Sequence, residues 1–291
     1  MDDPRVIRSA AQRRTVDDWS LALTAMGIEA RIDWSPQHGY LLIVAGDAAQ
    51  RAYAALDAYD DENRPRPAPL SIPEYGSGVA GALLAAALCA LFVFTGPRAN
   101  GHPWFAAGSA DAARMQAGEW WRAVTALTLH DDFPHILSNA VVLLIFGSSL
   151  CTVVGPGAGL WLMLLSGTAG NLLNVLLRGT PYTGIGASTA IFGALGALAA
   201  VRVVQRRSGA AVSPWRAWAP FAGALGLLAM LGASARSDVI AHLFGFLAGL
   251  VLGGALATLH PRPFARRAQV ALVIAAMGAV VACWAAALRS A

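Results

Sequence analysis

The sequence predicts an all-α polytopic membrane protein that begins with a small soluble α+β domain. Three observations predict this class. The 291 residues are 56% hydrophobic and 13% charged, and their mean hydropathy is +0.54, which is too apolar for an ordinary soluble protein. Apolar runs long enough to cross roughly 30 Å of hydrocarbon recur from Gly78 onward. The only long hydrophilic stretch comes before them.

That hydrophilic stretch has the pattern of a small folded domain. Its spacing of apolar side chains predicts a helix, two strands and a helix, at residues 16–27, 28–34, 40–44 and 47–59. An acidic run and a proline-rich segment follow, which is typical of a stiffened linker. We therefore expect a small α+β domain over residues 1–66, a linker over 67–76 and a membrane domain over 77–291.

Seven membrane spans are predicted from the apolar runs. They lie near residues 78–96, 135–154, 157–177, 185–204, 217–235, 238–259 and 268–288. The segment 97–134 is too polar to span, and its tryptophans favour a structured loop that lies partly in the membrane interface. Gly245, Gly249 and Gly253 recur every fourth residue of the sixth span, a spacing that lets helix backbones approach closely.

Arginine placement predicts the orientation of these spans. The sequence has no lysine, and most of its 21 basic residues fall in segments 1–66, 202–216 and 262–267, which share one side. The other side carries only Arg98, Arg114, Arg122, Arg178, Arg236 and Arg289. Because basic residues concentrate on the cytoplasmic side, we expect the N-terminus to be cytoplasmic.

Four polar side chains then fall at similar depth near the outer face. His135 and Asn139 open the second span, Ser188 opens the fourth and His242 lies near the start of the sixth. Polar groups inside lipid are costly and usually functional. A serine and a histidine at matched depth indicate a nucleophile and its general base. His135 and Asn139 share one helix face, so either could donate to an oxyanion together with the Ser188 backbone N–H.

Simpler structural explanations exist for each of these residues. A serine in a Gly/Ala-rich span commonly bonds back to its own helix, and a His–Asn pair can form interhelical hydrogen bonds. Asp238 has two possible roles: it, or Ser237, could cap the sixth span, or its carboxylate could orient His242 as a triad acid does. We favour the cap, because a carboxylate at the water interface is well solvated and backbone amides compete for it.

Composition excludes several other mechanisms of peptide-bond hydrolysis. Without lysine a Ser–Lys dyad is impossible, and no His-Glu-x-x-His sequence supplies a zinc protease site. No span interior holds an Asp or Glu for an aspartyl mechanism. His130, His135 and His242 could in principle hold a metal, but no carboxylate or cysteine completes a ligand set. We therefore predict no metal site.

Over residues 75–260 the sequence resembles the rhomboid family of intramembrane serine proteases. The residues that carry the resemblance are Trp121-Arg122, the spaced His130, His135 and Asn139, Gly186-Ala187-Ser188-Thr189, and Ala241-His242 followed by Gly245 and Gly249. The resemblance implies a rhomboid-like bundle of about seven helices. It also implies a serine endopeptidase that uses a Ser–His dyad without metal or cofactor. Such an enzyme cleaves transmembrane protein substrates near the outer membrane face.

The resemblance further implies a role for each site residue. Ser188 is the nucleophile and His242 the general base, while His135 and Asn139 line the oxyanion hole. The supporting positions are Gly186, Trp121, Arg122, Gly245 and Phe192, the last of which is expected against the histidine ring. The implied partners are transmembrane substrates and the lipid bilayer, with no nucleic acid, and the implied location is a bacterial inner membrane. Oligomeric state, natural substrate and the role of the N-terminal domain stay open.

Three positions depart from the common family pattern. Thr189 replaces a glycine after the serine, Phe244 replaces a glycine in the histidine segment, and Cys151 replaces a glutamate. Thr189 and Phe244 could crowd the Ser–His contact and lower activity. Two alternatives to a protease are a rhomboid-like protein that binds membrane clients without cutting them and a secondary transporter, which would use polar groups at the midplane.

Overall fold

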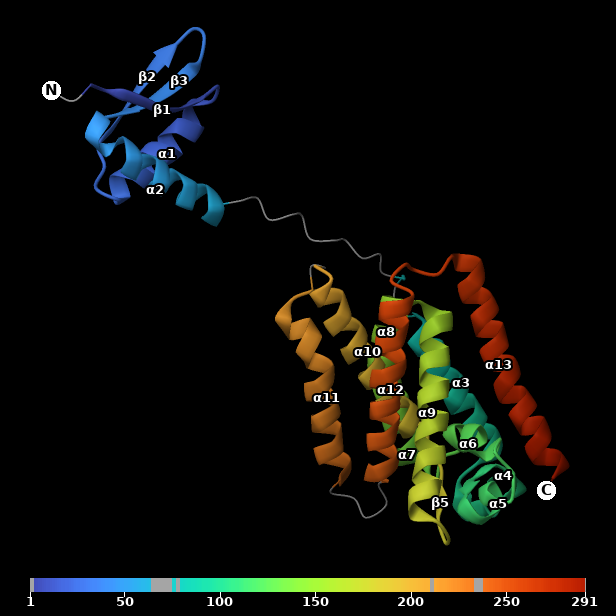
Figure 1. Ribbon diagram of the computed structural model, residues 1–291. Coiled ribbons are helices and arrows are strands. Elements are labelled where there is room, and N and C mark those ends of the chain that lie inside the picture. Colours follow the sequence, from blue (N-terminus) through green and yellow to red (C-terminus); the bar gives the residue numbers. More distant parts are fainter. Residues whose placement is uncertain (1–2, 64–74, 77–78, 210–211, 233–237, 291) are drawn as a thin grey trace. The chain divides into compact units, whose positions relative to one another are not determined.

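The structure, a computed structural model, describes residues 3–63, 75–76, 79–209, 212–232 and 238–290. The chain divides into two compact units, Met1–Ala68 and Pro69–Ala291, and each is described by itself (Figure 1). Most of the predicted linker 67–76 falls outside the described residues.

The N-terminal unit is a three-stranded antiparallel sheet packed on two helices. Its elements are β1 (Arg5–Ala10), α1 (Arg13–Ala25), β2 (Ala30–Ser35), β3 (Gly39–Val44) and α2 (Ala49–Glu62), with strand order β1-β3-β2. Val16 and Leu23 of α1, Leu42 of β3 and Leu56 of α2 have no exposed surface and form its core. The predicted helix, two strands and helix are present.

The prediction missed β1, which makes the pattern βαββα rather than αββα. This strand pairs with β3, but its register shifts between Val6 and Arg8. The irregularity breaks the period-2 alternation by which a strand is detected in a sequence.

In the membrane unit, six helical segments are long and apolar enough to cross a membrane. They are Val79–Asn100, Phe133–Val154, Pro156–Arg178, Ser188–Arg207, Val239–Leu259 and Arg266–Arg289. They correspond to six of the seven predicted spans. The remaining one, 217–235, overlaps α11 (Pro214–Gly232) and ends in residues 233–237, which lie outside the described residues. Figure 1 shows α11 alongside α10 and α12.

The second span is not a uniform α-helix. It consists of α7 (Phe133–Val142), a π-helical turn η4 (Leu143–Gly147) and α8 (Ser148–Val154). The first span, α3 (Val79–Thr95), packs against it. A Cβ atom on Gly81 of α3 would lie 2.8 Å from the Cα of Ser148, so glycine permits this close approach.

The centre of the unit is formed by α9 (Pro156–Arg178), α10 (Ser188–Arg207) and α12 (Val239–Leu259). The stripe of Gly245, Gly249 and Gly253 on α12 faces α10. A Cβ atom on Gly253 would lie 2.6 Å from the Cα of Ala197, so the two backbones are in direct contact. The predicted close-packing role of the glycine stripe agrees with this geometry.

Between the first two spans, the polar segment folds into short elements. They are η2 (Arg98–Asn100), α4 (Pro103–Gly108), β4 (Ala110–Asp111), α5 (Ala112–Gln116), α6 (Arg122–Thr125) and η3 (Ala126–Thr128), and β4 pairs with β5 (Thr183–Gly184). The buried Arg122 side chain holds this loop together: Nη1 donates to the carbonyls of Ala106 and Ser109, both at 3.0 Å, and Nε donates to Glu119 at 2.6 Å.

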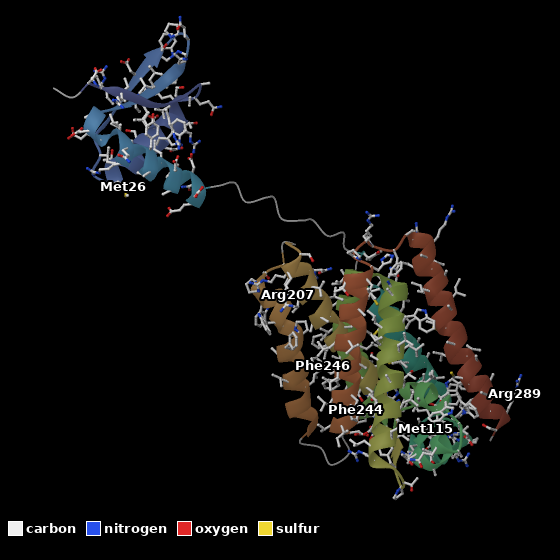
Figure 2. The ribbon with its side chains drawn as sticks, viewed as in Figure 1. Met26, Met115, Arg207, Phe244, Phe246 and Arg289 are labelled. Atoms are coloured by element: carbon white, nitrogen blue, oxygen red, sulfur yellow. The ribbon has the colours of Figure 1, made fainter. Side chains whose placement is uncertain are left out.

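The last span, α13 (Arg266–Arg289), packs against α9 and against α4 and α6 of the loop. Figure 2 shows Arg207, which ends α10, and Arg289, which ends α13, at opposite ends of the membrane unit. Met115 of α5 lies toward the same end as Arg289.

Candidate active site

The close contact of α10 and α12 brings Ser188 and His242 together. Ser188 is the first residue of α10 and His242 is the fourth of α12, so both lie at helix starts. The Oγ atom of Ser188 is 2.7 Å from Nε2 of His242, within hydrogen-bond distance. Because Ser188 begins its helix, its backbone N–H has no acceptor inside α10.

The His242 ring stacks on an aromatic side chain. The Phe192 ring, one turn after Ser188, stacks on it with centroids 4.7 Å apart and an interplanar angle of 17°. Phe192 belongs to a buried cluster with Leu195 and Ala224, on which Phe246 of α12 also packs (Figure 2). Within the part of the chain that the structure describes, Nδ1 of His242 has no hydrogen-bond partner. Ser188 and His242 thus form a hydrogen-bonded pair.

His135 faces the segment that leads into Ser188. The backbone N–H of Asp131 donates to His135 Nδ1 at 3.4 Å, so in the neutral ring the proton lies on Nε2. Gly186 lies against that nitrogen with φ +126°, and a Cβ there would sit 2.8 Å from His135 Nε2 and 3.6 Å from Ser188 Oγ. Only glycine fits between the two side chains, and His135 Nε2 is a donor beside the serine.

Asn139 is held by its own helix. Its Nδ2 donates to the carbonyl of His135 at 2.8 Å, and the side chain is 95% buried, with only 5% of its surface exposed. An amide nitrogen carries two protons, so one remains for another acceptor. Asn139 and His135 both border the same cavity as Ser188 and His242.

That cavity has a volume of about 650 Å³ and opens among charged residues. Its lining includes Ser188, His242, His135 and Asn139, and also Arg98, Asp131, Asp132, Asn171, Arg178, Tyr182, Thr189, Phe192 and Asp238. All four residues that the sequence singled out as reacting groups thus share one cavity.

Asp238 caps the helix that carries His242. Its Oδ1 accepts from the backbone N–H of Ala241 at 3.1 Å and lies 3.3 Å from Nη2 of Arg178. Its Oδ2 accepts from Nδ2 of Asn174 at 2.6 Å and from the Tyr182 hydroxyl. The carboxylate is thus occupied as a cap and as a link to α9, which agrees with the favoured interpretation. Ser237, the other predicted cap, lies outside the described residues.

The sequence did not predict the side chains that bind Asp238, namely Asn174, Arg178 and Tyr182. Burial, then the bond to Asp238, raises the pKa of Tyr182 above its ordinary value, so its hydroxyl stays protonated and donates. Asn174 and Arg178 lie four residues apart on one face of α9. A buried asparagine inside an apolar span is itself a signal, since polar groups there usually have a specific partner.

Trp121, Arg122 and Phe244 are not among the residues that line the cavity, whereas Thr189 borders it. Trp121 and Arg122 belong to the first loop, where Arg122 binds loop carbonyls. The Thr189 side chain packs toward Gly170 of α9 and Gly245 of α12. Because two glycines accommodate it, Thr189 does not separate Ser188 from His242. Phe244 lies on α12, half-buried (Figure 2).

His130, the first residue of the spaced His–His–Asn pattern, lies before α7 begins and outside the predicted span 135–154. Burial, together with the nearby His135, lowers its pKa to about 3, so the ring is neutral at ordinary pH. Its Nε2 accepts from the backbone N–H of Ala187 at 3.4 Å. His130 therefore supports the backbone next to Ser188 from outside the cavity.

Comparison with known proteins finds rhomboid relatives. Residues 117–259 match the family described as Rhomboid domain. The chain is 32% identical to the rhomboid protease GluP of Bacillus subtilis over 117 residues. This match covers 40% of this chain and 23% of GluP. The chain is 37% identical over 79 residues to the putative rhomboid protease YdcA of Bacillus subtilis, 27% of this chain and 40% of that one. It is 34% identical over 148 residues to rhomboid-like protease 3 of Toxoplasma gondii, 50% of this chain and 55% of that one.

The chain spans less than two thirds of the length of these relatives. The matches confirm the resemblance to the rhomboid family, and with six apolar helices they make the chain an integral multi-pass membrane protein.

Proposed function

Because residues 117–259 carry a rhomboid domain, we propose that the protein is an intramembrane serine endopeptidase that cleaves transmembrane protein substrates. The observation that carries this proposal is the 2.7 Å contact between Ser188 Oγ and His242 Nε2 inside a cavity within a membrane-spanning bundle. A protein that only bound membrane clients would need neither group, and a transporter would use polar groups at the midplane.

In the proposed reaction Ser188 attacks the substrate carbonyl carbon while His242 Nε2 takes the hydroxyl proton. The negative charge on the carbonyl oxygen is stabilised by donors that already face the cavity, namely His135 Nε2, the second proton of Asn139 and the free N–H of Ser188. His242 then gives its proton to the leaving amine as the peptide bond breaks. Water hydrolyses the acyl-enzyme, with His242 again as base.

Phe192 and Gly186 have supporting roles in this proposal. The stacked Phe192 ring limits rotation of the His242 imidazole, which keeps Nε2 directed at Ser188. Gly186 leaves the space in which the substrate carbonyl oxygen approaches His135. Trp121 and Arg122 shape the loop beside the site, and Gly245 lets α12 approach α10 closely.

The proposed location is the inner membrane of a bacterium, with the N-terminus in the cytoplasm. Arginine asymmetry supports that orientation. The cavity then opens toward the outer side, from which water and the extracytoplasmic part of a substrate would enter.

The proposal is tested with purified protein in liposomes and a single-span reporter substrate. We expect wild-type protein to cleave the reporter, and both Ser188→Ala and His242→Ala to abolish cleavage with little change in melting temperature. Ser149→Ala is the matched control, because the hydroxyl of that half-buried serine donates to the carbonyl of Ile145 in the same span at 2.7 Å. A Ser188→Ala protein that cuts at the wild-type rate would rule out the mechanism.

A further inference from the structure

The helix α13 lies outside the matched rhomboid domain, which ends at residue 259. In Figure 1 it runs along α9, and its C-terminal half lies beside α4 and α6 of the first loop. Polar side chains attach it near both ends, through Gln269 and Trp284.

At the end nearest Arg266, α13 is attached through Gln269. The side chain is only 3% exposed, and its Oε1 accepts from the backbone N–H groups of Gly157 at 2.7 Å and Ala158 at 3.0 Å. Its Nε2 donates to the carbonyl of Val154 at 2.9 Å. Gln269 therefore satisfies backbone groups that the break between α8 and α9 leaves without helical partners.

At the other end, Trp284 attaches α13 to the turn η3. Its indole N–H donates to Thr128 Oγ1 at 3.1 Å, and its ring packs edge-on against Trp104, with centroids 5.4 Å apart. A Cβ on Gly108 would collide with this ring, so glycine leaves the space that it fills. The Thr128 hydroxyl in turn donates to the carbonyl of Thr125 at 2.7 Å.

The same turn holds the backbone that leads into the nucleophile. The N–H of Gly186 donates to the carbonyl of Ala126 at 2.9 Å, and the N–H of Ala187 donates to His130, two residues after Thr128, at 3.4 Å. Segment 126–130 thus forms both hydrogen bonds that fix the two residues before Ser188.

We propose that Trp284 is a positioning residue for the reaction. Through its bond to Thr128 it fixes the turn η3 against Gly186, and so orients the Ser188 backbone N–H toward the substrate oxygen. This inference rests on the proposed proteolytic function. In it, α13 holds the anion-binding backbone from a distance, without touching the substrate or the dyad.

The test compares two tryptophans that each donate one indole hydrogen bond between α13 and its neighbours. Trp284→Phe removes the bond to Thr128, whereas Trp161→Phe removes a 3.0 Å bond from α9 to the carbonyl of Leu272 on α13. We expect Trp284→Phe to lower kcat roughly 10-fold with KM unchanged, since small misplacements of reacting groups are costly. Trp161→Phe should leave kcat unchanged.

The hydroxyl of Thr128 provides a second, smaller change. Thr128→Val should lower kcat as Trp284→Phe does, and Thr128→Ser, which keeps the hydroxyl, should restore it. The double variant should be no worse than either single one, because both remove the same link. Fully additive losses, or equal losses in Trp284→Phe and Trp161→Phe, would overturn the inference.

A readout that needs no catalysis separates this inference from the proposed function. Backbone hydrogen exchange at residues 184–188 should accelerate in Trp284→Phe and Thr128→Val, but not in Trp161→Phe, because the Gly186 N–H bond loosens. Unchanged exchange there would refute the positioning role even if the protein cleaves. If the variants differ in exchange as expected but the wild-type protein does not cleave the reporter, only the proposed function is refuted.

Discussion

The α10–α12 contact and the start of α7 fix their functional groups in different ways. At the first, two backbones meet over glycines, and this helix packing brings Ser188 and His242 to 2.7 Å. At the second, His135 and Asn139 are oriented by single hydrogen bonds to a loop and to their own helix. We therefore expect the proposed dyad to depend on how closely two helices approach, and the proposed anion-binding side to depend on local hydrogen bonds.

After the loss of Ser188 or His242 itself, the largest effect is expected at the start of α7. His135→Ala and Asn139→Ala should each reduce turnover by roughly 10²–10³-fold, the scale seen when one oxyanion donor is lost. Melting temperatures should change little, because neither residue contributes to the α10–α12 packing. Turnover assays and thermal unfolding measure both quantities. Unchanged turnover in both single variants and in the double one would assign the pair to structure.

A smaller loss of activity, but a larger loss of stability, is expected at the helix contact. In Gly245→Ala the new Cβ would collide with the Thr189 carbonyl and lie 3.0 Å from Thr189 Cγ2. The helices must then separate, so we expect turnover to fall about 10²-fold and the free energy of unfolding to fall by about 1–3 kcal/mol. Turnover and denaturant-induced unfolding test this.

Gly254→Ala is the control for that variant. It lies on the same helix, but its Cβ would meet only Ala200 Cβ, at the ordinary distance of 3.8 Å. Both turnover and stability should stay at wild-type values. A Gly245→Ala protein that behaves like Gly254→Ala would show that the dyad does not depend on the close approach of α10 and α12.

A third, weaker effect is expected at Asp238, which joins α12 to α9. Asp238→Asn keeps an oxygen that accepts from the backbone N–H of Ala241. The Asn174 Oδ1 atom, which has no hydrogen-bond partner among the described residues, can accept from the new amide once the Asn174 side chain rotates. We therefore expect near-normal turnover. The free energy of unfolding should fall by about 0.3–1 kcal/mol, because the negative charge that stabilised the start of α12 is lost. A loss of turnover near 10³-fold or more, the scale of a triad acid, would show that Asp238 acts through His242.

Much of this arrangement could be predicted from the sequence because its signals are local. Span length and apolar composition located six helices that the structure also has, and matched depth singled out Ser188, His242, His135 and Asn139. The spacing of Gly245, Gly249 and Gly253 predicted the close contact of the sixth span with a neighbour. Each of these features depends on residues within one segment.

The rest depends on how segments meet. Asn174 of α9 and Tyr182, which follows α9, bind Asp238 because of the way in which α9 and α12 are rotated toward each other. Hydropathy does not encode the rotation of a helix about its axis. The π-helical turn at Leu143–Gly147 leaves no compositional trace in an apolar run. For the same reason the sequence did not show that Trp284, on the last span, bonds to Thr128 in the first loop.

The smallest effect is expected where neither region is touched. A truncated protein that begins at Leu70 should keep wild-type turnover and melting behaviour. The N-terminal unit has its own core around Leu23 and Leu56, and every candidate site residue lies at or beyond Trp121. We therefore propose that residues 1–66 fold separately and are dispensable for the reaction. Turnover of the truncated and full-length proteins in the same liposomes measures this. If the truncated protein unfolds at the wild-type temperature yet does not cleave, the N-terminal unit must act on the dyad or on substrate entry. In that case the helix contact, although correctly packed, is not sufficient for activity.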